Sequence, residues 1–430
     1  MLSRLSDEKI SAAFRRAIRE PGLFGEEDSA VIFYDLSYLK ERIEDMIGLF
    51  PESALHAVAV KANPLTKILK RIRELGAGAE AASLPELYLA EKAGFSSDKI
   101  VFDSPVKTVQ EIEYALKAGI HINADSLQEI ERIAVILKRI SSQSTVGIRI
   151  NPQVGTGSIL STSVAGEFSK FGVPIKTNRE ALAEIFLKYD WLCGVHLHIG
   201  SQGCEVGLLM KGIETVLIFV NEVNRLLEKK KDRRRIAIFD IGGGLPVSYH
   251  RDKEPVGMSQ YKEELKHRFD PLFTDEFKLI TEFGRYVHAN TGWTASRVEY
   301  VKKEKSVTTV MIHVGADMFL RKCYRPDDWH HEITVADSYG NIKTGRDMKR
   351  YVIAGPLCFA GDMIAKETIL PEIAEGDYII IHDTGAYTLS MWSRYNSRQI
   401  PKVIGYYNDG EIFEILRERE SLQTLWEFWT

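Results

Sequence analysis

The sequence predicts an α/β fold, in which eight parallel strands close into a (β/α)8 TIM barrel and a mostly antiparallel β domain follows. Two observations predict the barrel. Short, nearly continuous apolar runs alternate with segments of helical period, and eight such runs occur before residue 286. A third observation predicts the second domain, because alternating runs of Val, Ile and Tyr separated by turn residues follow residue 286.

The expected barrel strands, in chain order, are 55–60, 78–82, 99–103, 120–124, 145–151, 193–199, 236–241 and 279–283. Helical periodicity between them predicts helices at 65–75, 84–93, 108–118, 127–140 and 208–228. In the second domain, strands are expected at 307–314, 350–354, 378–383 and 401–407. Residues 1–34 are expected to add a helix and the strand 29–34 to that domain. The predicted domains are therefore a barrel at 35–285 and a β-rich domain built from 1–34 and 286–430.

Composition excludes several classes of function. The chain of 430 residues carries 56 Lys and Arg against 60 Asp and Glu, so its net charge of −4 argues against a nucleic-acid partner. Charged residues within the first eight positions do not suit a signal peptide, and no apolar stretch is long enough to span a bilayer. We therefore expect a cytoplasmic protein with no membrane partner. Its four cysteines are expected to be free thiols, since none are paired as Cys-x-x-Cys.

Polar side chains follow the expected strands at the end where barrel chemistry takes place. They are Lys61, Glu80, Ser83, Asn151, His198, Ser201, Gly242 to Gly244, Glu282 and Arg285. Lys61 closes a buried apolar run, and a partly desolvated lysine amine is a candidate Schiff-base nucleophile. Three glycines in a row let the backbone approach a phosphate closely, although a tight turn also requires them. His196 and His198 lack a third ligand at suitable spacing, so no metal site is expected.

Seven ordered motifs carry a resemblance to a known family. They are Val60-Lys61-Ala62-Asn63, Ala79-Glu80-Ala81-Ala82-Ser83, His196-Leu197-His198-Ile199-Gly200-Ser201-Gln202, Asp240-Ile241-Gly242-Gly243-Gly244, Glu282-Phe283-Gly284-Arg285, Gly355-Pro356-Leu357-Cys358 and Gly385-Ala386-Tyr387. From about residue 30 onward the chain resembles the fold-type III pyridoxal-phosphate (PLP) decarboxylases. It is most similar to diaminopimelate decarboxylases and more distantly similar to ornithine decarboxylases. The resemblance implies a PLP-binding barrel with an alanine racemase-like β domain.

The resemblance also implies a function, a cofactor and an assembly. The function is PLP-dependent decarboxylation of an amino acid through an external aldimine, in a homodimer that shares its active sites. The implied catalytic residues are Lys61, which carries the cofactor, His198, which stacks on it, Glu282, which faces its pyridine nitrogen, and Cys358, which protonates Cα. The implied cofactor-binding residues are Lys61, Glu80, His198, Ser201, Gly242, Gly243, Gly244, Glu282, Gly284, Arg285 and Tyr387. Cys358 and Tyr387 are expected to reach into the partner's site.

Two departures from the family pattern concern the substrate. Phe359 stands where diaminopimelate decarboxylases carry a glutamate that recognises the distal ammonium, and Phe283 replaces a proline. Because an aromatic ring offers an ammonium only a cation–π contact, we expect a different or modified amino-acid substrate. Its far end is expected to be anionic, neutral or large, as in a siderophore or secondary-metabolite intermediate. The implied substrate-binding residues are Arg285, Arg321, Tyr324, Phe359 and Tyr387, while Arg394 and Arg398 either line the pocket or are solvated.

Three alternatives remain open from the sequence. One is a PLP-dependent amino-acid racemase, which shares the barrel and the lysine chemistry. Another is a true diaminopimelate decarboxylase of lysine biosynthesis. The third is a non-catalytic binding protein of the antizyme-inhibitor kind, which would be expected to lack the lysine or the phosphate-binding glycines. Lys61 and Gly242 to Gly244 are both present.

Overall fold

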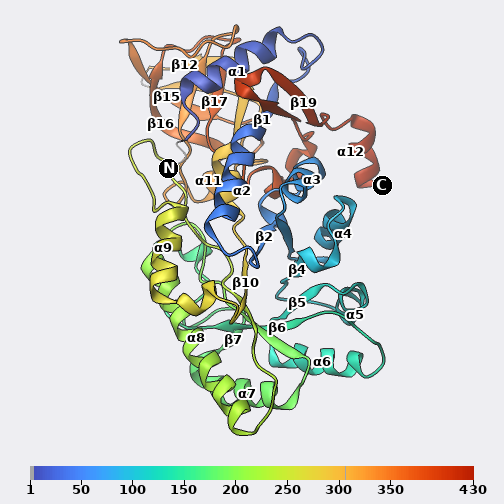
Figure 1. Cartoon of the computed structure of the whole chain (residues 1–430). Helices are drawn as coiled ribbons and strands as arrows, with labels where there is room; N and C mark the ends of the chain where they lie inside the picture. The colour runs from blue at the N-terminus through green and yellow to red at the C-terminus, as the bar shows by residue number, and fades with distance from the viewer. Residues whose placement is uncertain (1–3, 306) are drawn as a thin grey trace. The chain divides into compact units, whose positions relative to one another are not determined.

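The computed structural model describes residues 4–305 and 307–430, which form two compact units (Figure 1). The barrel unit consists of 42–247 and 255–287, and the β-rich unit consists of 4–41, 248–254 and 288–430. The domain boundaries expected from sequence, 35–285 against 1–34 with 286–430, differ from this division in three places. Residues 35–41 and 248–254 group with the β-rich unit, and residues 286–287 group with the barrel.

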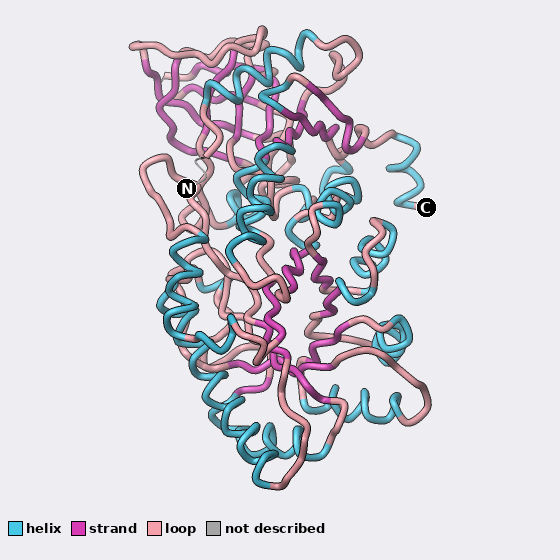
Figure 2. Tube along the Cα trace, in the orientation of Figure 1, coloured by secondary structure: helices cyan, strands magenta, loops and turns pink. Residues whose placement is uncertain are grey.

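The barrel unit contains a closed ring of eight parallel strands, which confirms the predicted fold class (Figure 2). Its strands are β2 (Leu55–Ala59), β3 (Gly78–Ala81), β4 (Ile100–Phe102), β5 (His121–Ala124), β6 (Val146–Asn151), β8 (Leu192–His196), β9 (Ile238–Asp240) and β10 (Lys278–Thr281). The ring closes because β5 pairs with β6 and β10 pairs with β2. A short ninth strand, β7 (Val173–Pro174), pairs with β6.

Helices follow most barrel strands and are α3 (Thr66–Glu74), α4 (Leu84–Lys92), α5 (Val109–Ala118), α6 (Leu127–Leu137), α7 (Ile175–Lys188), α8 (Val206–Lys229) and α9 (Met258–Arg268). Ser83, at the carboxyl end of β3, is the N-cap of α4, since its hydroxyl accepts a hydrogen bond from the backbone N–H of Glu86. Gly119 ends α5 with φ of 78°, a left-handed conformation that glycine adopts without strain. Among the described helices, none is both long and apolar enough to cross a bilayer.

The β-rich unit contains two sheets. The six-stranded sheet has the order β14 (Ile333–Ala336), β17 (Tyr378–Ile381), β11 (Gly292–Arg297), β1 (Ala30–Asp35), β18 (Lys402–Tyr407) and β19 (Ile412–Arg417). The four-stranded sheet has the order β12 (Tyr300–Lys303), β13 (Thr308–Met311), β15 (Met348–Ala354) and β16 (Met363–Pro371). Most pairs are antiparallel, with parallel pairing of β1 to β18 and of β13 to β15.

An aromatic core holds the larger sheet. The rings of Phe33 and Trp293 stack with their centroids 4.1 Å apart, and Phe14 of helix α1 (Asp7–Arg19) contacts both rings edge-on. The indole N–H of Trp293 donates to the Tyr406 hydroxyl at 3.0 Å, so the buried polar atom of the tryptophan is satisfied. The first helix and first strand of the chain are thus packed within the β-rich unit.

Candidate active site

The carboxyl ends of the barrel strands bring together the barrel residues that the sequence selected. Lys61 lies in a single 3-10 turn, Val60–Ala62, directly after β2, and Glu80 lies in β3. His198, the glycines 242–244 and Glu282 follow β8, β9 and β10. Barrel closure therefore places side chains from strands far apart in the sequence on one rim.

Lys61 forms an ion pair with Glu80 on the neighbouring strand. The lysine side chain is 40% exposed, whereas the Glu80 side chain is fully buried. Burial, together with the nearby charges of Glu282 and Asp103, raises the pKa of Glu80 to about 8 against the opposing charge of Lys61. The Oε1 atom of Glu80 is buried and has no hydrogen-bond partner within the described chain.

A buried histidine, His196, lies between two carboxylates at the centre of the rim. Its Nε2 atom is 3.4 Å from Oε2 of Glu282, and its Nδ1 atom is 3.5 Å from Oδ1 of Asp103. All three side chains are buried, and each follows or ends a different strand, β8, β10 and β4. Arg149 of β6 adds a contact of 3.3 Å between its Nη1 atom and Oδ2 of Asp103.

The charges of this cluster follow from its geometry. Burial alone would lower the pKa of His196, but the charges of Asp103 and Glu282 raise it to about 9. Burial would likewise raise the pKa of both carboxyls, yet the positive charge of His196 lowers it below the usual range in each. The cluster is therefore an imidazolium between two carboxylates at neutral pH, and both imidazole nitrogens carry protons.

A neighbouring carboxyl, Asp240, has its pKa shifted in the opposite direction. Burial raises its pKa well above the usual value, and the negative charge of Glu282 adds to the effect. Its Oδ2 atom accepts a hydrogen bond from the Asn123 amide at 3.1 Å, and Oδ1 accepts from the backbone N–H of Gly242 at 2.9 Å. Asp240 thus fixes the start of the glycine turn after β9.

The glycines after β9 are required by close backbone contacts. A Cβ on Gly243 would lie 2.4 Å from the carbonyl oxygen of Glu282, and one on Gly244 would lie 2.3 Å from that of Gly200. Gly244 also has φ of 108°, which side chains rarely allow. Gly284 has a similar packing role, because its Cβ would lie 2.8 Å from the Ala59 Cβ and 3.0 Å from the Ala62 Cβ. These glycines let the ends of β2, β8, β9 and β10 approach one another.

Two of the glycine N–H groups already have side-chain partners. The N–H of Gly242 donates to Asp240, and that of Gly243 donates to Nδ1 of His198 at 3.1 Å. Burial and the charge of Arg149 lower the pKa of His198 to about 3, so its ring is neutral. Nearby, Nε of Arg285 donates to the Ser201 hydroxyl at 3.0 Å. The candidate phosphate donors are therefore Gly244, Arg285 and Ser201.

The other sequence-selected residues belong to the β-rich unit. Cys358 is exposed, its backbone N–H donates to the Asn396 side chain at 2.7 Å, and its carbonyl accepts from the Tyr395 hydroxyl at 3.0 Å. The rings of Phe359 and Tyr324 stack at 5.0 Å with an interplanar angle of 15°.

Three arginines of the β-rich unit are engaged within it. The Arg321 guanidinium lies 4.8 Å from the ring centroids of both Trp329 and Tyr387. Arg394 pairs with Glu420, with Nη2 at 2.8 Å from Oε1, and Arg398 donates to the His313 carbonyl at 3.3 Å.

Sequence reasoning missed three members of the barrel site, namely Asp103, His196 and Asp240. The expected strands 99–103 and 193–199 contain the first two, and a selected motif contains the third. Their common signal is a charged or titratable residue at the carboxyl end of a buried strand, the same signal that selected Glu282. The sequence predicts no metal ligand at His196 and indicates only a strand residue there, because its two carboxylate partners are distant in the chain.

Glu80 should make protein freed of cofactor less stable as the pH rises from about 5.5 to 8.5. Its pKa is higher in the folded than in the unfolded state, so the folded state binds more protons, and its contribution is lost between about pH 4.5 and 8. The raised pKa of His196 acts in the same direction, whereas buried histidines with lowered pKa values, such as His56 and His121, act in the opposite one. Urea denaturation should therefore show that, between these pH values, the unfolding free energy of the wild type falls by roughly 3 kcal/mol more than that of Glu80→Gln. The same pH dependence in both proteins would contradict the assignment.

Comparisons with known proteins agree with this geometry. The family model described as pyridoxal-dependent decarboxylase, pyridoxal binding domain, matches residues 36–289. A diaminopimelate decarboxylase of Helicobacter pylori is 32% identical over 413 residues, covering 94% of this chain and 96% of the relative. One from Archaeoglobus fulgidus is 32% identical over 374 residues, covering 86% and 85%.

Solved structures give the same result. The crystal structure of diaminopimelate decarboxylase from Helicobacter pylori complexed with L-lysine matches with a TM-score of 0.81 and 29% identity, covering 93% of this chain and 96% of that one. The co-complex of the M. jannaschii enzyme with L-lysine gives 0.83 and 27%, covering 95% and 93%. The resemblance, the fold class, the cofactor and the enzyme class expected from sequence are thereby confirmed. The chain belongs to the pyridoxal-dependent decarboxylase family, and within it to the fold-type III amino-acid decarboxylases similar to diaminopimelate decarboxylase.

Proposed function

We propose that the enzyme decarboxylates an amino acid whose distal end is anionic, neutral or large rather than a simple ammonium. A siderophore or other secondary-metabolite intermediate has this chemistry. The observation that carries the proposal is Phe359, which occupies the position of the family's ammonium-binding glutamate and stacks on Tyr324. An aromatic pair provides no carboxylate for an ammonium.

The ring of Phe359 is held in place by its surroundings. A Cβ on Gly361 would lie 2.4 Å from Cζ of this ring, so the ring packs over the glycine backbone. The carboxylate of Asp362 accepts hydrogen bonds from the N–H of Leu357 at 2.7 Å and of Ala316 at 2.5 Å, which fixes the same turn. Phenylalanine in place of glutamate here therefore occupies a fixed position in the turn. Arg321 supplies the positive charge that would pair with an anionic far end of the substrate.

The second candidate substrate is meso-diaminopimelate. Diaminopimelate decarboxylases are the relatives at 32% identity, and the coverage of both chains is nearly complete. If meso-diaminopimelate is the substrate, a residue other than Phe359 has to bind the distal ammonium in place of the glutamate.

The residues of the barrel rim fit PLP. The Oε1 atom of Glu282 is buried with no hydrogen-bond partner in the described chain, and it is available to a cationic ring N–H. The glycine turn after β9 leaves no room for side chains beside the backbone donors. When bound, PLP supplies an electron sink for the electrons released with carbon dioxide.

Each residue of the proposed site then has a defined task. Lys61 binds the cofactor aldehyde through its amine, and Glu80 pairs with that amine. Glu282 holds a proton on the pyridine nitrogen, and His196 keeps Glu282 ionised for this purpose. His198 is neutral and presents a flat ring. Arg285, Ser201 and Gly244 bind the phosphate, and Cys358 donates a proton to Cα after decarboxylation.

Glu282→Gln should lower kcat by about 100-fold or more while the protein still retains PLP. The amide cannot hold a full positive charge on the ring nitrogen, but Lys61 and the phosphate donors remain. Steady-state kinetics together with cofactor content measured after gel filtration check this. Lys61→Ala is the matched control, because borohydride should fix PLP to a Lys61 peptide in Glu282→Gln and not in Lys61→Ala. Loss of cofactor without loss of kcat in the reloaded variant would contradict the role of Glu282.

The substrate proposal is tested by carbon dioxide release from a panel of amino acids with anionic, amide, aromatic and ammonium far ends. We expect turnover of meso-diaminopimelate to be weak and that of a carboxylate- or amide-bearing substrate to be strong. Phe359→Glu should raise turnover of meso-diaminopimelate by about 10-fold or more, because a new charge pair is worth more than 1.4 kcal/mol in a desolvated site. Phe359→Leu, which lacks a carboxylate, should not. Strong wild-type activity on meso-diaminopimelate would favour the second candidate.

We further propose that two copies form a homodimer in which Cys358 and Tyr387 of one copy complete the partner's site. The exposure of Cys358 in the single chain supports this arrangement. A proton donor needs to be shielded from solvent only when substrate is bound, so its side chain can be open to a second copy. Mixing Lys61→Ala with Cys358→Ala protein after dissociation should restore part of the activity, because one site of each mixed dimer has both residues. Mixed dimers confirmed by mass that stay inactive would contradict a shared site.

A further inference from the structure

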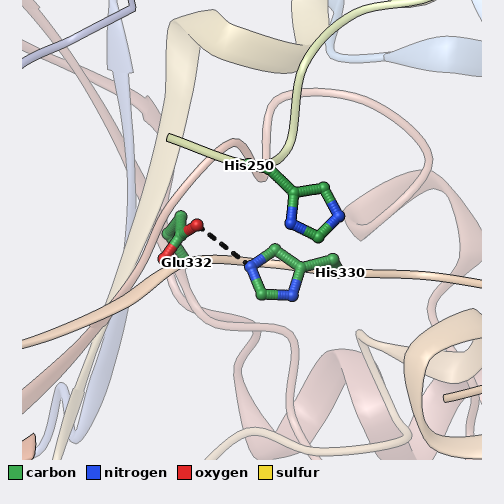
Figure 3. Close-up of side chains that lie close together, drawn as sticks. All are labelled: His250, His330 and Glu332. Atoms are coloured by element: carbon green, nitrogen blue, oxygen red, sulfur yellow. Dashed lines mark ion pairs between the residues drawn. The ribbon is translucent and has the colours of Figure 1, made fainter. Parts of the chain in front are cut away.

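The β-rich unit contains a second cluster of titratable side chains, made of His250, His330 and Glu332 (Figure 3). One ligand atom from each lies within 4.8 Å of the others. The imidazole rings stack with centroids 4.0 Å apart and an interplanar angle of 11°. All three side chains are half-buried.

We propose that His250, His330 and Glu332 bind one divalent transition-metal ion of the zinc class, with its remaining coordination positions open to water. Two imidazole nitrogens and one carboxylate oxygen are a donor set that suits Zn²⁺, Co²⁺ or Ni²⁺ and does not suit Ca²⁺ or Mg²⁺, which prefer oxygen.

Two of the three ligands already have coordination spacing. Nε2 of His330 lies 3.1 Å from Oε1 of Glu332, and ligand atoms around a tetrahedral zinc ion lie about 3.3 Å apart. The Nε2 atom is buried, and its contact with Glu332 lacks the alignment of a hydrogen bond. The ring of His250 completes the set by rotating out of the stack toward that edge.

The local backbone orients these ligands. The N–H of Arg251 donates to Oε1 of Glu332 at 3.1 Å, and the Arg251 guanidinium binds both oxygens of Asp7 at 2.7 Å. His250 follows a turn in which the Ser248 hydroxyl donates to the His250 carbonyl at 2.6 Å. The first bond orients the Glu332 carboxylate, and the last fixes the backbone from which the His250 ring extends.

The segment that carries His250 is anchored to the same unit. The Tyr249 ring packs edge-on against Trp329 at 6.4 Å and His331 at 5.3 Å. The Asn290 amide donates to the Ser248 carbonyl at 3.0 Å. A metal ion would therefore link the segment 248–254 to residues 330–332 within a frame that is already assembled.

The other metal-like cluster of the chain provides a contrast. Asp103, His196 and Glu282 have comparable spacing, but His196 carries protons on both nitrogens because its pKa is raised to about 9. The Asp103, His196 and Glu282 side chains are also fully buried, whereas those of His250, His330 and Glu332 are half-buried and accessible to an ion from solvent. The sequence-based expectation of no metal site considered only His196 and His198.

The experiment uses the full-length, PLP-loaded protein after chelator treatment and removal of unbound cofactor. Titration with Co²⁺ should give visible ligand-field absorption that saturates at one ion per chain and is displaced by Zn²⁺. His250→Ala, His330→Ala and Glu332→Gln should each weaken the affinity by about 100-fold or more. Zn²⁺ should raise the thermal midpoint of the wild type and not of these variants.

The matched control is His313→Ala. His313 is also half-buried in the β-rich unit and pairs with a glutamate, with Nε2 at 2.8 Å from Oε2 of Glu299, but among the described residues no third ligand accompanies it. The His313→Ala variant should leave Co²⁺ binding unchanged. Glu332→Gln preserves the side-chain shape, so the test does not depend on an alanine variant that fails to fold. Binding that is equally tight in the three ligand variants, or that is absent from the wild type, would overturn the proposal.

Discussion

The barrel site depends on one buried interaction, the imidazolium of His196 between Asp103 and Glu282. Barrel closure brings these carboxylates together, because they follow strands β4 and β10, which do not pair with β8 but lie in the same closed ring. Two ionised carboxylates cannot share a buried space without a positive charge, and one of them would otherwise take up a proton. His196 therefore sets the charge of Glu282, on which the electron sink depends.

Most of the barrel could be predicted from sequence. Its strands are buried on both faces and read as apolar runs, so their ends, including Lys61 and Glu282, were located to within a few residues. In the β-rich unit, strands β11, β12, β14, β16 and β19 were not among those expected. In β12 and β16, Lys302, Lys303, Lys366 and Glu367 interrupt the apolar pattern on an exposed sheet. Helices α7 and α9 were missed because each has few apolar residues at helical spacing and many charged residues between them.

The candidate site was predicted in part, for a physical reason. Residues that begin a motif or end a run can be selected from one strand alone, as Lys61 was. The function of His196 depends on Asp103 and Glu282, which are 93 and 86 residues away in the chain, and only the register of a closed barrel brings them together. The same holds for the stack of Tyr324 on Phe359, which the sequence could suggest only as two separate substrate-binding residues.

Strand β1 is held between β11 and β18, so the first strand of the chain is paired on both sides by segments synthesised much later. All eight barrel strands leave the ribosome before β18 does. Chains shortened by premature termination or by C-terminal proteolysis would therefore contain every barrel strand, yet they would expose the apolar Ala30–Asp35 with a bare edge. Such edges template intermolecular sheets, so truncation products of this protein should aggregate rather than persist as isolated barrels.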